Sequence, residues 1–368
     1  MKRRDFLSGA AITGAATATT VASALSTPAI AQDRRELKLV TTWPKNFPGL
    51  GTSAERWAQR ITAMSDGRLT VKVYAAGELV PAFEAFDAVS SGTADMYHGA
   101  EYYWQGKSKA FNFFAAVPFG LTATEINAWV YHAGGQQLWD ELSAGFNIKP
   151  MLVANTGVQM GGWFNKEINA VEDYKGLKIR IPGLGGEVLR RIGAAAVSLP
   201  GGEVFPALQS GAIDATEWVG PWNDLAFGFY KVAKYYYYPG FHEPGTALSG
   251  GVNLAVWDSL SDADKAIIEA AAAAENDYTL AEFNTRNGDA LATLVNEHGV
   301  ELRKFSDDIM KAIGDAAGEV VAEVAAEDPM TKKVYDSFID FRTKAVGWAR
   351  IADQAYWTAR ELPYAYGQ

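Results

Sequence analysis

Residues 177–221 read LKIRIPGLGGEVLRRIGAAAVSLPGGEVFPALQSGAIDATEWVGP, and in this stretch short extended segments alternate with short helical ones. The extended segment 177–183 ends in Pro-Gly, one helical segment ends at Gly193, and the next has Gly211 at its carboxyl end. Residues 212–217 are again extended, so the polar DATEW sequence lies at the end of a strand. This alternation predicts α/β layers around a largely parallel sheet, in which ligands bind at the carboxyl ends of the strands.

The rest of the chain has the same organisation. Strands are predicted at 37–43 and 69–75, on either side of a helix over 53–65 that has Ser53 as its N-cap. One helix is predicted over 122–142, another from 261 to 298, and almost continuous helix from 307 to the end. The aromatic residues of this last part form an apolar stripe, which packs either on the chain itself or against a second subunit: Tyr335, Phe338, Phe341, Trp348, Tyr356 and Trp357.

Length and composition exclude several classes of protein. A chain of 368 residues favours two domains, and 48% hydrophobic with 21% charged residues is ordinary for a globular protein. The net charge of -10 argues against a nucleic-acid partner, since such partners are held by clustered Lys and Arg. The absence of cysteine excludes disulfides, thiolate nucleophiles and zinc–thiolate sites.

The N-terminus predicts export. Residues 2–7 are KRRDFL, an apolar stretch rich in small residues follows over 10–25, and Ala29-Ile30-Ala31 supplies an A-x-A cleavage site. We therefore interpret residues 1–31 as a signal peptide that is cleaved before Gln32. The paired arginines favour the twin-arginine route, and the periplasm is the predicted location.

The sequence contains few recognisable catalytic motifs. His98, His132, His242 and His298 have no metal-binding spacing, and there is neither a G-x-S-x-G elbow nor a P-loop. The glycine cluster at 183–188 lacks the third glycine of a dinucleotide site, because Val188 stands there. One enzyme alternative is a secreted carbohydrate-active enzyme that uses Glu217 and Glu243 as its carboxylate pair.

Residues 177–221 resemble the signature of the extracytoplasmic solute-binding proteins of TRAP transporters, which have a strand-borne Arg, an A-L-Q-x-G helix and an I-D-x-x-E strand. Further matching stretches cover most of the chain beyond residue 31: AAGELVP at 75–81, VSSGTADM at 89–96, NTGVQMGGWF at 155–164 and YYYYPG at 235–240. Within the family, Gln159, Glu217 and Trp218 resemble the branch that binds 2-oxo monocarboxylates such as pyruvate and 2-oxobutyrate. Binders of lactate or other 2-hydroxy acids are the near alternative.

The resemblance implies a two-domain periplasmic binding-protein fold with a ligand cleft, crossing hinge strands and a long C-terminal helix. The expected boundaries are 36–156 with 246–290 for domain I and 157–245 with 291–330 for domain II. Residues 331–368 would be a C-terminal helical segment that forms a homodimer. The resemblance further implies that the protein has no catalytic activity, and that it delivers its ligand to membrane subunits that use a sodium gradient.

The resemblance also implies the residues of the site. Arg180 would contact the ligand carboxylate, for which a guanidinium offers a planar pair of donors. A metal ion would be held by Glu217, the backbone carbonyl of Trp218, Gln159 and Glu243, which offer the oxygen ligands that hard cations prefer.

The metal is expected to be sodium in the 2-oxo acid branch and calcium in the lactate binders. Two carboxylate ligands, Glu217 and Glu243, would favour a divalent ion.

Asn155 and Tyr103 complete the substrate-binding set, with Arg180, Gln159, Trp218 and Glu243. The alternatives are structural: Glu217 would pair with Arg180, and Trp218 would belong to the core. Two positions depart from the family pattern, because Glu101 interrupts a run of tyrosines and His242 stands where an aromatic residue is expected.

Overall fold

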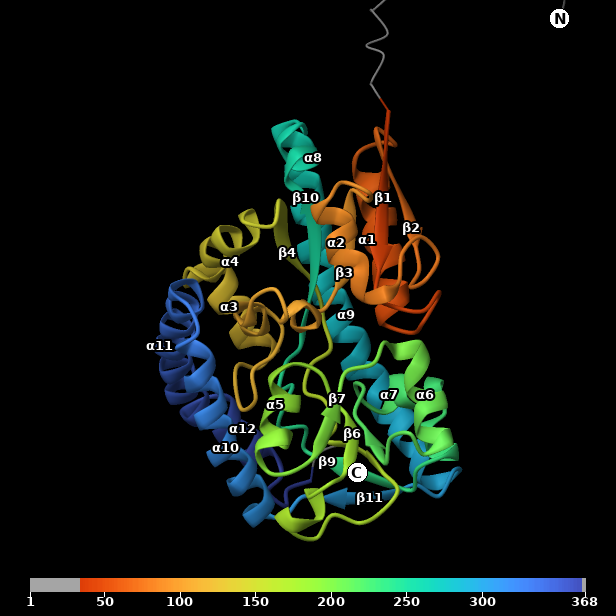
Figure 1. Cartoon of the computed structure of the whole chain (residues 1–368), viewed down its shortest axis with the longest axis vertical. Coiled ribbons are helices and arrows are strands. Elements are labelled where there is room, and N and C mark those ends of the chain that lie inside the picture. The colour runs from red at the N-terminus through yellow and green to blue at the C-terminus, as the bar shows by residue number, and fades with distance from the viewer. Residues whose placement is uncertain (1–33, 366–368) are drawn as a thin grey trace, which may run out of the picture. The chain divides into compact units, whose positions relative to one another are not determined.

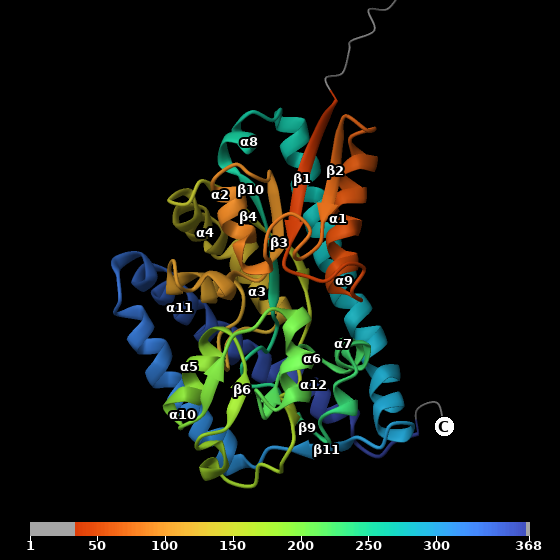
Figure 2. The same ribbon diagram turned by 45° about the vertical axis from the view of Figure 1, so that its right-hand side comes forward.

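The structure, a computed structural model, describes residues 34–365, and these residues form two mixed β-sheets covered by helices (Figures 1 and 2). The first sheet has the order β2-β1-β3-β10-β4 and the second the order β11-β9-β5-β8-β6-β7. The α/β class is therefore confirmed. The strands are β1 (Arg35–Thr41), β2 (Leu69–Tyr74), β3 (Met96–Gly99), β4 (Ile148–Asn155), β5 (Gly162–Phe164), β6 (Lys178–Arg180), β7 (Ala195–Val197), β8 (Ala215–Thr216), β9 (Tyr235–Tyr238), β10 (Ala247–Asn253) and β11 (Glu301–Lys304).

The helices alternate with these strands along most of the chain. They are α1 (Leu50–Met64), α2 (Ala85–Ser90), α3 (Ala123–His132), α4 (Gly135–Ala144), α5 (Gly183–Arg191), α6 (Gly201–Ser210), α7 (Pro221–Phe227), α8 (Leu254–Asp258), α9 (Asp262–Asn296), α10 (Asp307–Ala325), α11 (Pro329–Ile351) and α12 (Asp353–Arg360). Short 3-10 turns are η1 (Ala82–Glu84), η2 (Glu101–Trp104), η3 (Lys109–Phe114), η4 (Val171–Tyr174) and η5 (Phe229–Lys231).

The sheets are less parallel than the sequence pattern predicts. In the first, β1 pairs in parallel with β2 and β3, but β10 runs antiparallel to both β3 and β4. In the second, β6 is parallel to β7 and β8, whereas β5 is antiparallel to β8 and β9. Since β11 also pairs in parallel with β9, the prediction of a largely parallel sheet holds in part. It fails at β5 and β10, because these strands enter their sheets from the other sheet instead of through a helical crossover.

Two connections carry the chain between the sheets. The chain leaves the first sheet at the end of β4 and reaches β5 of the second through residues 156–161, and it returns from β9 to β10 through residues 239–246. The 35-residue helix α9 contacts β4 and α1 at the first sheet and α7 beside the second, as Figure 1 also shows. The long helix in contact with both parts is thus α9, which precedes the C-terminal helices.

Helix boundaries differ from prediction at two glycines. The helix predicted over 122–142 is divided into α3 and α4 by Gly134, whose φ of 88° is left-handed. Helix α1 begins at Leu50 after Gly49, so Ser53 is a buried residue inside the helix and is not its N-cap. Gly211 does end α6 in the predicted left-handed conformation, with φ of 74°.

The C-terminal helices contact both the chain and solvent. The Phe338 ring packs against those of Phe113 and Trp129, so the first half of α11 belongs to the core. Large apolar side chains from Trp348 onward are exposed. Within residues 34–365, no helix has the length and apolarity to cross a membrane.

The predicted domain boundaries stay a prediction. One of them, at residues 290–291, falls inside the continuous helix α9, so a hinge there would have to bend a helix. The predicted signal peptide lies outside the described residues.

Candidate functional site

The two connections between the sheets run side by side and bring distant residues together. The Gln159 backbone N–H donates to the Glu243 carbonyl at 3.1 Å, and the Gly240 N–H donates to the Gln159 carbonyl at 2.9 Å. A Cβ atom on Gly240 would lie 2.5 Å from that carbonyl oxygen, so this close approach requires glycine. Residues 84 positions apart in sequence are thereby fixed as neighbours.

The side chains of Gln159 and Glu243 form a buried polar contact. The Gln159 amide nitrogen donates to Glu243 Oε2 at 2.7 Å, and the Thr246 hydroxyl donates to the same oxygen. The amide oxygen of Gln159 is buried and has no hydrogen-bond partner among residues 34–365. A buried acceptor without a donor is suited to a cation, so these residues fit a metal site.

Arg180, at the carboxyl end of β6, is the only side chain in this group with a permanent positive charge. Its Nε donates to the Leu199 carbonyl at 3.1 Å, and NH1 donates to the backbone carbonyl of Glu217 at 3.2 Å and to its carboxylate. NH2 has a long contact of 3.4 Å with the Tyr103 hydroxyl. The structural ion pair considered from sequence is therefore present, and the NH2 edge has the weakest partner.

The imidazole of His242 lies beside the Glu217 carboxylate. Its Nε2 lies 3.2 Å from Glu217 Oε2, while Oε1 of the same carboxylate pairs with Arg180. One ligand atom each from Glu217, His242 and Glu243 lies within 4.8 Å of the others, and all three residues are buried. Two acids and one imidazole beside a guanidinium form a concentrated charge cluster.

Burial and mutual charge shift the pKa values of this cluster. Burial, followed by the charge of Glu217, raises the pKa of Glu243 to about 7. Burial opposes the protonation of His242, yet its hydrogen bond to Glu217 and the carboxylate charge raise its pKa above the ordinary value. Burial raises the pKa of Tyr103 to about 12, so its hydroxyl stays a neutral donor and acceptor.

Beside the cluster is a small hollow, and four of its nine lining residues are aromatic. It holds little free space in this structure, so it favours a small ligand. The Arg180 guanidinium lies 5.0 Å from the Trp218 ring centroid, which places the cation beside this wall. The lining residues are Trp43, Leu50, Tyr102, Tyr103, Thr156, Gln159, Trp218, Val219 and Leu248.

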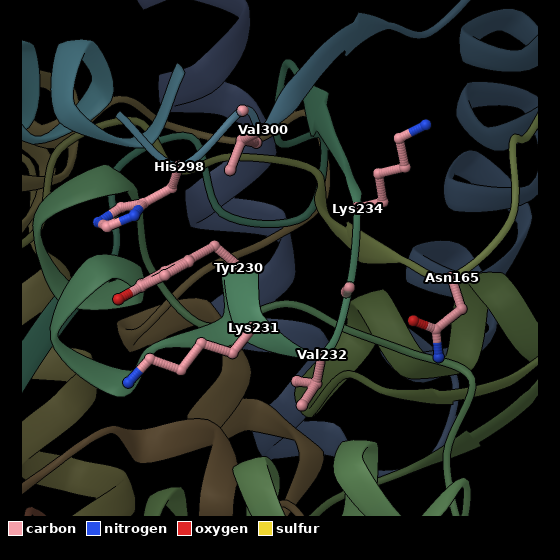
Figure 3. Close-up of a pocket in the computed structure, with 9 residues that line it drawn as sticks. Asn165, Tyr230, Lys231, Val232, Lys234, His298 and Val300 are labelled. Carbon is pink, nitrogen blue, oxygen red and sulfur yellow. The ribbon is translucent and has the colours of Figure 1, made fainter. Parts of the chain in front are cut away.

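A larger hollow lies elsewhere, on the side of the second sheet, with about 550 Å³ of empty volume (Figure 3). The rings of Tyr230 and His298 are stacked there with centroids 3.9 Å apart. Lys231 and Lys234 point away from each other in Figure 3, so they do not converge on one anion. None of the residues predicted for the site lines this hollow.

The structure brings together six of the predicted site residues: Arg180, Gln159, Tyr103, Trp218, Glu217 and Glu243. Asn155 is nearby, but its amide is engaged with the backbone, since it donates to Gly245 at 3.2 Å and accepts from Gly157 at 2.8 Å. In this arrangement Asn155 fixes the two connections to each other. Its predicted contact with the substrate stays a prediction.

Sequence reasoning noted His242 only as a departure from an expected aromatic residue and did not place it in the charged cluster, because a lone histidine has no metal-binding spacing. The available signal was its position directly before Glu243. His98, in contrast, is a buried structural residue that accepts from Trp43 Nε1 at 2.7 Å, and burial lowers its pKa to about 3. Burial and then the Arg56 charge keep its imidazole neutral.

Comparison with known protein families shows which family has this fold and site. Residues 39–328 match the model of the bacterial extracellular solute-binding proteins of family 7. The chain belongs to this family. The resemblance to TRAP-transporter binding proteins is thereby confirmed, and so is the expectation of a binding protein instead of an enzyme. The carbohydrate-active alternative is accordingly set aside for this family 7 protein.

Three similar proteins have a name or a bound ligand that refers to a 2-oxo acid. The chain is 41% identical to a monocarboxylate 2-oxoacid-binding periplasmic protein of Nostoc sp., over 97% of this chain and 98% of that one. It is 43% identical, with a TM-score of 0.86, to a TRAP periplasmic solute-binding protein of Pseudoalteromonas atlantica with bound sodium and pyruvate, covering 88% of this chain and 99% of that one. A third relative, from Colwellia psychrerythraea with bound calcium and pyruvate, is 41% identical, with a TM-score of 0.85 over 89% and 99% of the chains.

Proposed function

We propose that this protein is the periplasmic ligand-capturing subunit of a TRAP transporter and that it binds a 2-oxo monocarboxylate, such as pyruvate or 2-oxobutyrate, together with a metal ion. The observation that carries the proposal is a buried guanidinium beside two buried carboxylates and an unpartnered amide oxygen, next to a small aromatic hollow. The ligands of the similar proteins described above support the choice of acid.

Arg180 is proposed to hold the ligand carboxylate through its NH2 edge. That nitrogen has only the 3.4 Å contact with Tyr103, whereas Nε and NH1 are engaged with backbone carbonyls and Glu217. The carboxylate would then lie next to the Tyr103 hydroxyl, which remains neutral and can donate to it. The remaining part of a small acid would be accommodated by the aromatic walls.

The metal is proposed to lie among Glu217, Glu243, Gln159 and the backbone carbonyl of Trp218. With His242 neutral, one guanidinium and three carboxylates, counting that of the ligand, give the group a net charge of -2 when they are ionised. A divalent ion would neutralise that charge, so calcium is favoured over the sodium first expected. Because calcium accompanies pyruvate in the Colwellia relative, a calcium requirement would not by itself indicate a 2-hydroxy acid.

Tryptophan fluorescence should report binding directly, because Trp218 and Trp43 line the hollow. The protein would be titrated with pyruvate, 2-oxobutyrate, 2-oxoisovalerate and lactate, each with sodium or calcium as the only added cation. We expect a saturable change with the 2-oxo acids. Replacing Trp218 by Phe should remove most of the signal, whereas Trp348→Phe, at a position 66% exposed, should leave it unchanged. A response confined to lactate would instead indicate a hydroxy-acid binder, and no response to any acid would refute the proposal.

We further propose that the two parts of the chain close on the ligand, with the predicted boundaries near residues 156 and 246. The crossing connections that carry Gln159 and Glu243 are the places where such a motion would alter the site. Export through the twin-arginine route with removal of residues 1–31, and delivery to membrane subunits, complete the proposed role.

Dimerisation through the C-terminal helices is the remaining proposal. Six large apolar side chains of this segment are at least half exposed: Trp348, Ile351, Tyr356, Trp357, Leu362 and Tyr364. A second copy of the chain would cover them. We expect analytical ultracentrifugation to find a dimer that Trp348→Lys with Trp357→Lys converts to a monomer, while Tyr131→Lys on α3 leaves it intact. A wild-type monomer at all concentrations would contradict this proposal.

A further inference from the structure

We propose that His242 is itself a metal ligand, so that Glu217, His242 and Glu243 form a mixed nitrogen–oxygen site able to take a divalent first-row transition ion. This inference rests on the proposed function, because it concerns the same cation site. It goes beyond that function by adding a nitrogen ligand and a different class of metal.

The spacing of the three side chains suits coordination to one ion. His242 Nε2 lies 3.2 Å from Glu217 Oε2, and ligand atoms of all three residues lie within 4.8 Å of one another. Two ligands bound at about 2.1 Å to one ion, at angles between about 90° and 109°, are about 3.0–3.4 Å apart. The separation of His242 from Glu217 therefore fits a shared ion, and Glu243 is the third side chain within reach of it.

Packing holds the imidazole at this position. The residue is 2% exposed, and its ring centroid lies 5.3 Å from that of Phe241. A Cβ atom on Gly185 of α5 would lie 2.8 Å from His242 Cβ, so a glycine provides the space for the histidine. A cation that reaches Glu217 Oε2 consequently meets the imidazole there, and sharing the ion is easier than displacing the buried ring.

A further polar atom indicates that the cluster is incomplete without a ligand. The amide oxygen of Gln159 is buried with no hydrogen-bond partner among the described residues. Sodium and calcium prefer oxygen ligands, whereas imidazole favours zinc, copper and nickel. A site containing His242 should therefore bind transition ions more tightly, relative to calcium, than an all-oxygen site does.

Pulsed electron paramagnetic resonance of one equivalent of Cu²⁺ tests the contact itself. The mature protein would be prepared without a histidine tag and with His132→Gln and His298→Gln, because both of these histidines are exposed. We expect ¹⁴N modulation from a coordinated imidazole, and its loss in His242→Gln. The absence of imidazole nitrogen, or a signal that survives His242→Gln, would overturn the proposal.

Metal affinities supply a second readout. His242→Gln keeps an amide donor for Glu217 but removes the imidazole, so nickel affinity should fall at least about 10-fold relative to calcium affinity, since even outer-shell changes cost about 10–100-fold. An unchanged nickel-to-calcium ratio would count against His242 as a ligand. If wild type binds pyruvate with calcium or sodium but shows no imidazole coordination, only this inference fails. If no acid binds with any cation, the proposed function fails.

Discussion

Replacing Arg180 by alanine should weaken binding of a 2-oxo acid at least about 100-fold. Its guanidinium is proposed to hold the ligand carboxylate, and it also neutralises Glu217, with both side chains about 1% exposed. Removing one member of a buried ion pair typically costs about 3–5 kcal/mol, because the other charge remains buried without a partner. Isothermal titration calorimetry with pyruvate and calcium would measure the loss.

Two further variants make the Arg180 result interpretable. Arg180→Lys keeps the charge but loses the planar pair of donors. This variant should therefore fold, but it should bind the 2-oxo acid considerably more weakly than wild type does. Arg190→Ala, on the exposed end of α5, removes a guanidinium that pairs with Glu187 at 3.5 Å, and this variant should bind the ligand normally. Wild-type affinity in a folded Arg180→Ala protein would mean that Arg180 is only the structural partner of Glu217.

The half of the site carried by strand ends could be predicted from sequence. Arg180 is the last residue of β6 and Glu217 directly follows β8, and neighbouring parallel strands place their carboxyl ends together. The pairing of β6 with β8 brings this about, since Arg180 lies opposite Thr216 in the register. The local pattern was sufficient for this half because both segments belong to one sheet.

The other half of the site required information that the local pattern does not contain. Gln159 and Glu243 lie on loops without periodicity, and they meet because the chain crosses twice between the sheets. Only the resemblance to a family placed them together. The same crossings explain why the sheets are mixed, since β5 and β10 have no helical crossover before them.

Glu101 shows how a departure from the family pattern is accommodated. The sequence did not show which residues around Glu101 line the pocket. In the structure its side chain turns into the core and accepts from the Tyr97 hydroxyl at 2.5 Å, while Tyr102 and Tyr103 line the hollow. The sequence EYYW alone does not indicate which side chains of η2 enter the core and which line the hollow.

A buried carboxyl at this position should make stability depend on pH. Burial raises the pKa of Glu101 to about 7, although hydrogen bonds with Tyr97 and Ser249 lower it. Its folded pKa is thus above the ordinary value of 4.5, so the stabilisation is complete below that value and is lost as the pH rises through 7. The total change is about 3 kcal/mol, at about 1.4 kcal/mol per pH unit between about pH 5 and 7.

Urea unfolding of wild type and Glu101→Gln at pH 5, 6, 7 and 8 would measure this effect. Gln can still accept from Tyr97 but cannot ionise, so the variant should lose less stability than wild type as the pH rises. Burial also raises the pKa of Asp224 to about 7, and that of Glu243 likewise, so both proteins should keep some decline and only their difference reports Glu101. Glu269→Gln, at an exposed position on α9, should follow wild type. Parallel curves for wild type and Glu101→Gln would show that Glu101 has the same protonation state in the folded and unfolded chains over this range.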